Sequence, residues 1–398
     1  MLKSFLQNEN SKNRILKKIY FLIHQYGPIS KSKLLEITEM RKTTLARIID
    51  ELLFYEYITK SGFEESSVGR PPVLYQAEKK SGYLIGIHIT RTDFRVLLSD
   101  VQFNILELKV ITMTSLHVPS TVLSQIEEFI KDFLVKYEIK NKELLGIGIG
   151  AIGPLDTKSG IIFEPASFPA PGWKNISIVE YFSKRFSVTC ILEYGVNMAA
   201  FGERSDKLNM YDNILYCMSG RELGCGIIIN GELFNNSHIA DVGRHGHMTI
   251  HTGGRKCSCG KYGCLITYTS PQSILNQVME HSNHGDRWNG DLDKLKTDEL
   301  VEFLRQGKEN VSELVYQSAY YLGVGVSNLI TMFNSEAVVL NGPLINEYPY
   351  YFEQTVKSIQ AHTNLTSNQD VYFSKASSKD NSGAIGAAIY LFYSYFEM

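Results

Sequence analysis

The sequence of 398 residues predicts an α/β protein in which an N-terminal winged helix-turn-helix precedes a larger, two-lobed α/β body. Three observations support this prediction. The first 80 residues read as three helices followed by two strands. The remainder alternates strands and helices in two similar blocks, and one of its loops gathers three cysteines behind a histidine. The length suits two or three domains, and a hydrophobic content of 44% supplies their cores.

Charge is unevenly distributed along the chain. Residues 1–80 hold 14 Lys and Arg against 9 Asp and Glu, whereas the remaining residues hold 26 against 33. A basic head on an acidic body favours a small polyanion-binding module joined to a part that binds no polyanion. Chance clustering would explain the charges equally well.

Apolar stretches of the chain are only strand-length, and Gly, Asp or Asn interrupts them. The N-terminus has no apolar core followed by a cleavage site. We therefore expect a soluble cytoplasmic protein without a membrane partner.

The first helix is predicted over residues 13–25. Its apolar face holds Ile15, Ile19, Leu22 and Ile23, and Lys17 and Lys18 lie away from that face. Gly27 and Pro28 end the helix, and Ser30 can cap a second helix over residues 31–38. After a turn at Glu39 and Met40, a third helix carries an apolar stripe made by Leu45, Ile48, Ile49, Leu52 and Leu53.

The start of this third helix offers hydrogen-bond donors on the face opposite the stripe. These donors are Arg41, Lys42, Thr43, Thr44 and Arg47. Two strands, over residues 57–63 and 72–77, flank a wing in which Gly69-Arg70-Pro71-Pro72 holds an arginine on a stiff backbone. This plan is typical of a domain that binds double-stranded DNA, with Arg70 beside a minor groove or phosphates. The alternative is a solvated helix face.

The body begins with strands predicted over residues 83–90, 94–100 and 105–113, a helix over 120–137 and a buried strand over 144–153. A similar opening follows over residues 213–220, 224–230 and 231–234, which indicates a duplicated two-lobed architecture. We divide the chain into a DNA-binding domain (1–80) and a body (81–398). Its small lobe comprises about 81–195 plus the C-terminal helix 381–398, and its large lobe about 196–380. The Gly/Ala-rich start of that helix can pack closely against a strand or loop.

The strongest local chemistry is the spacing H-x9-C-x-C-x4-C made by His247, Cys257, Cys259 and Cys264. Three thiolates and one imidazole close a tetrahedral zinc site, and Gly260 and Gly263 allow tight turns between ligands. A site with four protein ligands has no open position, so we predict one structural Zn²⁺ per chain. His245 or His251 could replace His247, and three free cysteines in a loop are the alternative. The other cysteines, Cys190, Cys217 and Cys225, lie in strand-like runs, unlike a disulfide framework.

These motifs together resemble the ROK family of repressors and sugar kinases, in particular its branch of NagC-, xylose-repressor- and Mlc-like regulators. The resemblance covers nearly the whole chain. It rests on the helix-turn-helix, the GRPP wing, Gly153-Pro154-Leu155-Asp156 with Gly160, Pro171-Gly172-Trp173, residues 243–247, residues 257–264 and the terminal NSGAIGAA. It implies an actin-like, hexokinase-type fold in which His247, Cys257, Cys259 and Cys264 bind zinc.

Departures from the family pattern predict that the body is not an enzyme and has no catalytic residue. The kinases have a D-x-G-G-T phosphate loop, but here His88 replaces the aspartate and Thr90-Arg91 the glycines. In the family's E-N-D-x-N segment an aspartate accepts the proton of the sugar hydroxyl, and Gly195 stands in its place. Phosphoryl transfer from ATP therefore lacks both of its supports.

The sugar site implied by the resemblance is altered as well. Arg244 and Ile266 occupy two positions where the family has glutamates, so an unphosphorylated hexose is a poor ligand. We expect Asn197, Arg244 and His247 to be the effector contacts, with Arg244 favouring an anion such as a sugar phosphate or a carboxylate. The alternative is an ion pair between Arg244 and a neighbouring acid, with no ligand bound.

The leading hypothesis is a sequence-specific transcription regulator, a repressor, that reads a DNA operator as a homodimer or a dimer of dimers. Two alternatives stay open. One is a sugar kinase with an added DNA-binding head, which the changes at His88 and Gly195 disfavour. The other is a regulator without an effector, whose body serves only for dimerisation.

Overall fold

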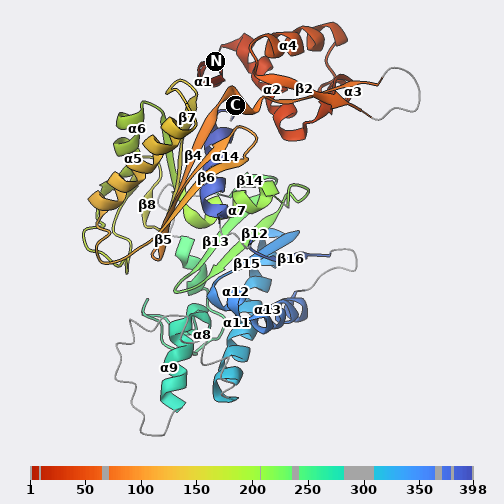
Figure 1. Cartoon of the computed structure of the whole chain (residues 1–398). Helices are drawn as coiled ribbons and strands as arrows, with labels where there is room; N and C mark the ends of the chain where they lie inside the picture. Colours follow the sequence, from red (N-terminus) through yellow and green to blue (C-terminus); the bar gives the residue numbers. More distant parts are fainter. Residues whose placement is uncertain are drawn as a thin grey trace. The chain divides into compact units, whose positions relative to one another are not determined.

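The computed structural model describes residues 2–8, 10–64, 71–206, 208–234, 242–281, 309–363, 370–377 and 381–396. The chain forms two compact units (Figure 1). Unit 1 comprises Met1–Ile152, Asp156–Glu193 and Ala387–Met398, and unit 2 comprises Gly153–Leu155 and Tyr194–Gly386. The N-terminal region therefore shares one compact unit with the first lobe of the body. Over the described residues, every helix is too short or too polar to span a membrane.

The N-terminal region, called the head below, has the predicted winged helix-turn-helix arrangement. Its helices are α1 (Leu2–Gln7), α2 (Ser11–Tyr26), α3 (Lys31–Thr38) and α4 (Lys42–Phe54). Strands β1 (Ile29–Ser30), β2 (Ile58–Phe63) and β3 (Val73–Ala77) pair in the order β1-β3-β2. The Ser30 side chain accepts the backbone N–H of Lys33 and caps α3, as predicted. The stripe on α4 is buried at Leu45, Ile48, Ile49 and Leu52.

The predicted apolar face of α2 is partly wrong. Ile15 is 49% exposed, whereas Lys17, predicted to point away from the core, is 5% exposed. Tyr20 is completely buried, one turn further along the same side of the helix. The reason is that α2 buries two faces, one inside the head and one against other parts of unit 1.

Unit 1 contains a five-stranded sheet in the order β11-β7-β4-β5-β6. Its strands are β4 (Tyr83–Ile89), β5 (Asp93–Asp100), β6 (Ile105–Thr112), β7 (Leu144–Ala151) and β11 (Thr189–Tyr194). Figure 1 shows α5 (Pro119–Lys136) and α6 (Ile178–Phe186) on one side of this sheet. The 3-10 helix η1 (Lys79–Ser81) joins the head to β4. A small sheet, β10-β9-β8, is formed by Ile176–Ser177, Ile161–Ile162 and Leu155–Asp156.

Unit 2 repeats the same topology in the order β14-β13-β12-β15-β16. Its strands are β12 (Ile214–Ser219), β13 (Leu223–Ile229), β14 (Glu232–Leu233), β15 (Ala337–Asn341) and β16 (Tyr372–Lys375). In both sheets the first strand pairs antiparallel with the second and parallel with the fourth. The duplication predicted from two similar openings is confirmed.

The described residues of unit 2 include helices α7 (Gly195–Asp206), α8 (Ile266–Thr269), α9 (Pro271–His281), α11 (Glu309–Phe333), α12 (Pro343–Glu347) and α13 (Pro349–His362), with the 3-10 helix η2 over Val242–His247. The C-terminal helix α14 (Ser382–Ser394) begins in unit 2 and ends in unit 1. It packs as closely as its glycines predicted. A Cβ at Gly148 of β7 would collide with the carbonyl of Ala387, and one at Gly386 would collide with the carbonyl of Met198.

Candidate functional site

The first turns of α4 expose a row of cationic and hydroxyl side chains. Arg41 is the N-cap residue and makes no side-chain cap bond, and Lys42, Thr43 and Arg47 are exposed. Thr44 is half-buried on the same stretch of helix. Among the residues that the structure describes, Arg41, Lys42 and Arg47 take part in no ion pair. These cations are therefore available for base edges or phosphates.

The acidic residues further along α4 are paired with lysines from the preceding helices. Glu51 lies 2.8 Å from the ammonium of Lys12 in α2, and Asp50 lies 3.9 Å from that of Lys31 in α3. The exposed pairs add little stability, but they offset the negative charge next to the cationic turns. As a result, α4 presents a basic N-terminal half to solvent.

The wing is described only in part. Gly69 and Arg70, predicted to contact DNA, lie outside the described residues. Lys60 is exposed on β2, the strand that precedes the wing in the sequence. The sequence analysis did not single it out. The signal was present, since Lys60 stands in a strand pattern whose outward positions are polar. We add Lys60 to the candidate DNA-binding residues.

The four predicted metal ligands lie together in unit 2. The ligand atoms of His247, Cys257, Cys259 and Cys264 are all within 4.8 Å of one another. The Cys257 Sγ is 3.4 Å from the His247 Nδ1, and the Cys259 Sγ is 3.7 Å from the Cys264 Sγ. A tetrahedral zinc site with its usual bond lengths places two sulfurs roughly 3.8 Å apart and a sulfur and a nitrogen roughly 3.6 Å apart. The group therefore fits a tetrahedral ion of this size.

Backbone bonds shape the metal loop, defined here as residues 247–264. The Cys257 N–H donates to the Lys261 carbonyl at 2.8 Å, and the Gly263 N–H donates to the Arg255 carbonyl at 2.8 Å. Gly263 has a φ of 74°, and a Cβ there would collide with the carbonyl of His251. This position requires glycine for both reasons. The turns deliver the three thiols to one point.

Sequence analysis preferred His247 over His245 and His251, and His247 is the histidine that lies with the three cysteines in the structure. The His251 Nδ1 is instead hydrogen-bonded to the Tyr268 hydroxyl at 3.2 Å. The same hydroxyl accepts the Arg255 N–H at 3.0 Å, and the Arg255 guanidinium lies 4.4 Å from the Tyr268 ring centroid. His245 is not part of the group among the described residues. Tyr268 therefore holds the metal loop at two positions inside it, His251 and Arg255, without being a ligand.

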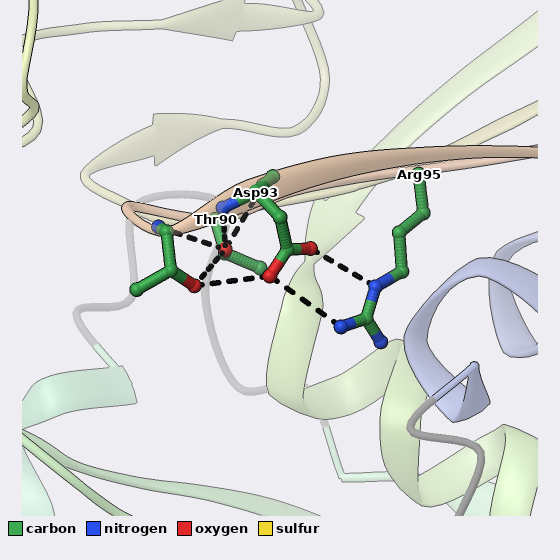
Figure 2. Close-up of polar contacts among 4 residues, drawn as sticks. Thr90, Asp93 and Arg95 are labelled. Carbon is green, nitrogen blue, oxygen red and sulfur yellow. Dashed lines mark hydrogen bonds and ion pairs between the residues drawn. The ribbon is translucent and has the colours of Figure 1, made fainter. Parts of the chain in front are cut away.

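The β4–β5 turn stands where the resemblance implies a phosphate loop, and it is closed by its own side chains (Figure 2). The Thr90 Oγ1 accepts the backbone N–H groups of Thr92 at 3.2 Å and of Asp93 at 3.0 Å. The Asp93 carboxylate forms an ion pair with the Arg95 guanidinium, with Oδ1 and Nε 2.9 Å apart. Phosphate loops instead direct free N–H groups at the ligand. This turn has committed two amides to its own side chain, and its carboxylate is paired with an arginine of the same hairpin.

The segment in which the resemblance implies the family's catalytic base runs from the end of β11 into α7. The Tyr194 hydroxyl accepts the Leu155 N–H at 3.3 Å, and Gly195 at the start of α7 is buried. Asn197 follows in the first turn and is 4% exposed. Position 195 therefore presents no group that can accept a proton.

The candidate effector residues belong to two segments of unit 2 that both meet β13. A Cβ at Gly224 of β13 would lie 3.0 Å from the side chain of Val196, the neighbour of Asn197. A Cβ at Gly246, the neighbour of His247, would lie 3.3 Å from the Leu223 Cβ. Arg244 lies in η2, but its side chain is outside the described part of the chain.

Comparison with protein families and curated proteins gives a consistent relationship. The model of the ROK family matches residues 84–392. The xylose repressor of Bacillus spizizenii is 27% identical over 348 residues, which cover 87% of this chain and 85% of the repressor. The transcriptional dual regulator NagC of Escherichia coli is 26% identical, over 82% of this chain and 79% of NagC.

Solved structures show the same fold. A ROK family transcriptional regulator described as a homologue of the E. coli MLC protein matches with a TM-score of 0.76 and 22% identity, covering 96% of each chain. A ROK hexokinase from Thermus thermophilus matches with a TM-score of 0.65 and 22% identity, covering 78% of this chain and 99% of its own. The regulator fold thus matches nearly the whole chain, whereas the hexokinase fold leaves about a fifth of it unmatched.

Proposed function

Because the chain belongs to the ROK family, we propose that it is a sequence-specific DNA-binding transcription regulator that acts as a repressor. The observation that carries this proposal is the head, which precedes the family-matched residues 84–392 and exposes Arg41, Lys42 and Arg47 at the start of α4. A relative named as a xylose repressor and another named as a DNA-binding transcriptional dual regulator match most of the chain, which supports DNA binding and regulation of transcription.

The body is proposed to be non-catalytic. The turn at Thr90 and Asp93 uses its amides internally, and Gly195 stands where a general base is required. Both features argue against phosphoryl transfer, which depends on positioned donors around the phosphates and on a base for the attacking hydroxyl. Purified protein incubated with ATP and a panel of hexoses should form no ADP above background. Turnover on the order of 1 per second would contradict the proposal.

The metal group is proposed to hold one structural Zn²⁺ through His247, Cys257, Cys259 and Cys264. The donor set and its spacing support zinc, which binds sulfur and imidazole and needs no open position in a structural site. The bound ion would supply cross-linking of the loop. The chain's own backbone bonds around Gly263 would hold the ligands in place before the ion binds.

The protein is proposed to act in the cytoplasm as a homodimer or a dimer of dimers on a two-fold symmetric operator. A small anionic effector, a sugar phosphate or a carboxylate, is proposed to bind near Asn197, Arg244 and His247. The meeting of the Asn197 and His247 segments at the start of β13 supports a shared site. A guanidinium in place of a family glutamate supports an anion.

The DNA assignment is tested with an operator that the protein itself selects from a random duplex library. Arg47→Ala should weaken binding to the selected duplex by roughly 1 to 3 kcal/mol and relax preference at one base pair, because a base contact is lost. Lys42→Ala should weaken all duplexes alike and reduce the salt slope by about one, as expected for a phosphate contact. Fluorescence anisotropy at several salt concentrations measures both.

Lys18→Ala is the matched control, since Lys18 is an exposed lysine of the same head on a different helix, α2. It should bind as the parent does. If the protein selects no duplex, or if Arg47→Ala and Lys18→Ala behave alike, α4 is not the recognition helix and the proposed function fails.

A further inference from the structure

Two cysteines outside the metal group face each other across the sheet of unit 2. Cys217 of β12 pairs directly with Cys225 of the antiparallel neighbour β13, and their Sγ atoms lie 3.6 Å apart. Directly opposite residues of an antiparallel pair have Cα atoms about 4.5 to 5.5 Å apart, and a disulfide spans about 4.4 to 6.8 Å between Cα atoms. The backbone spacing therefore suits a disulfide, and the two sulfurs already lie in contact.

Both thiols are buried in the apolar core of unit 2. Cys217 is 1% exposed and Cys225 is 2% exposed. They belong to one cluster of buried side chains from the sheet and from α11, which includes Leu215, Leu322 and Val326. Among the described residues, no third His, Cys, Asp or Glu joins the pair to form a metal-binding group. The pair therefore lacks the donors of a tetrahedral zinc site, and a bond between its own two sulfurs is the chemistry that its geometry favours.

The other face of β13 leaves its backbone little room to move. Gly224 and Gly226 flank Cys225 and face the opposite side of the sheet. A Cβ at Gly226 would lie 2.3 Å from the Val196 carbonyl oxygen of α7, and one at Gly224 would lie 3.0 Å from the Val196 side chain. The strand is thus packed between α7 and the apolar core.

The movement that a disulfide requires is small enough for the side chains alone. The S–S bond is about 2.05 Å long, so the two sulfurs must approach each other by roughly 1.5 Å. Rotation about the Cα–Cβ bonds supplies a displacement of this size and leaves the packed strand in place. A disulfide between Cys217 and Cys225 is therefore compatible with the fold of unit 2.

The surroundings of the pair keep its thiols protonated. A hydrogen bond with Cys217, together with burial, raises the pKa of the Cys225 thiol well above its ordinary value. Thiolates rather than thiols attack oxidants, so the pair reacts only when the hairpin opens locally and one sulfur ionises. Once one sulfur has been oxidised, its partner is the nearest nucleophile.

We propose that Cys217 and Cys225 form a redox modification site, at which a peroxide converts the two thiols into an intrachain disulfide that restrains the β12–β13 hairpin. This inference is independent of the proposed function. In cytosolic proteins such bonds are mostly transient and serve in redox sensing.

The reaction has two steps. In the first step one thiol loses its proton and the thiolate attacks a peroxide oxygen, so that the O–O bond breaks and a sulfenic acid and a hydroxide form. In the second step the partner thiol attacks the sulfenic sulfur, the S–S bond forms, the S–O bond breaks and water leaves. Overall, the two thiols lose two protons and two electrons, and the peroxide is reduced to two molecules of water. A dithiol reductant reverses the change by thiol–disulfide exchange.

Trypsin separates the two cysteines, because Arg221 lies between them. Residues 208–221 contain Cys217, and residues 222–244 contain Cys225. The full chain is treated with hydrogen peroxide in a buffer that contains zinc, its remaining thiols are alkylated in denaturant, and the digest is analysed by mass spectrometry. We expect most copies of both cysteines in a linked pair of these two peptides, lighter by two hydrogens than the reduced peptides together. A dithiol reductant should separate the pair.

The same treatment in concentrated urea shows whether the fold directs the bond. The unfolded chain should give a mixture of links among its six cysteines, whereas the folded chain should give the link between Cys217 and Cys225 in preference to all others. The same mixture from folded and unfolded protein would overturn the proposal. Oxidation of the two thiols to sulfinic acids without a linked pair, or full retention of both thiols at completion, would overturn it as well.

Hydrogen exchange tests the restraint on the hairpin. The backbone amides of β12 and β13 should exchange at least about fivefold more slowly in the oxidised protein, because the bond restricts opening of the hairpin. Exchange in β7 of unit 1 should not change. Equal exchange of the hairpin before and after formation of the linked pair would refute the restraint.

Two variants complete the experiment. Cys190→Ser is the matched control, since Cys190 lies in β11 of unit 1, and this variant should form the linked pair as the parent does. Cys217→Ser should leave Cys225 unlinked and its hairpin exchange unaffected by peroxide. A link from Cys225 to another cysteine in folded Cys217→Ser, at the extent seen in the parent, would show that the pairing across the strands does not select the partner.

Discussion

The head and the metal loop are held in place by different forces. The head contacts the rest of unit 1 through a cluster of rings, called the aromatic clamp, that consists of Tyr20, Phe21, His24, Phe103, Phe392, Tyr393 and Phe396. These rings come from three distant segments, and their burial makes little directional demand. The metal loop depends on four ligand atoms within 4.8 Å and on a few backbone bonds, all of which are directional. We therefore expect that removal of one ligand abolishes metal binding by the loop, whereas the stability of the clamp decreases by a similar step with each ring that is removed.

The largest effect is expected from removing the metal. Elemental analysis should find one zinc per chain in the parent, and Cys259→Ser or a strong chelator should abolish it, because three remaining ligands close no tetrahedron. Binding free energies of structural zinc are about 10 kcal/mol or more, so the thermal midpoint of the large lobe should fall by about 10 °C or more.

Cys190→Ser is the control for the metal experiment, since Cys190 lies in β11, outside the metal group. It should retain zinc and its thermal midpoint. A parent free of zinc after preparation without chelators would contradict the prediction. The aromatic clamp should be insensitive to the chelator, and faster hydrogen exchange in α2 after metal removal would show that the two regions are not independent.

A smaller effect is expected from acid, and it acts on the clamp. Burial lowers the pKa of His24 to about 4, while an unfolded histidine titrates near 6.5. Above pH 6.5 both states are neutral and the stability is complete. Between pH 6.5 and 4 the unfolded state binds a proton that the folded state refuses, so stability falls as the pH falls. We expect a loss of about 3 kcal/mol by pH 4, because each pKa unit between the two states corresponds to about 1.4 kcal/mol.

Denaturant unfolding of the parent and of His24→Phe at pH 7, 5.5 and 4.5 measures this effect. A phenylalanine keeps the aromatic packing and removes the titration. The unfolding free energy of the parent minus that of His24→Phe should therefore decrease as the pH falls. Changes at carboxylates and at the metal ligands are common to both proteins and cancel. A difference that stays constant with pH would contradict the assignment of a neutral His24 in the clamp.

Local patterns predicted the parts of the molecule that depend on neighbouring residues. The cap at Ser30, the apolar stripe on α4 and the spacing of His247 before the three cysteines each act within a short segment, so their consequences could be read from the sequence. The spacing alone did not choose among the three histidines, and the preference for His247 came from the family resemblance. The bond that engages His251 with Tyr268 comes from the fold and could not be read from the sequence.

The clamp could not be predicted for the same physical reason. Lys17 and Tyr20 lie on the side of α2 opposite its expected core, and their partners follow some 370 residues later. No local periodicity reports a contact of that sequence separation. The β4–β5 turn could be predicted only in part. The sequence indicated that its glycines were lost, but the closure of its amides by Thr90 depends on the turn conformation.

The smallest effect concerns Tyr268, which tests whether the metal loop is held only by its ligands. Tyr268→Phe removes the hydroxyl that accepts the Arg255 N–H and contacts the His251 ring, and it keeps the ring beneath the Arg255 guanidinium. An unsatisfied backbone donor costs about 1 kcal/mol or somewhat more. Zinc affinity, measured by competition with a chromophoric chelator, should therefore fall about five- to tenfold.

Tyr262→Phe is the matched control, since Tyr262 belongs to the same loop and is 54% exposed. It should bind zinc as the parent does. Equal affinities for both variants would mean that the ligands alone hold the loop. A loss confined to Tyr268→Phe, with unchanged exchange in α2, would show that directional bonds outside the ligand set stabilise the metal loop independently of the clamp. Directional bonds would then distinguish the metal loop from the clamp at a supporting residue, Tyr268, as well as at the metal ligands.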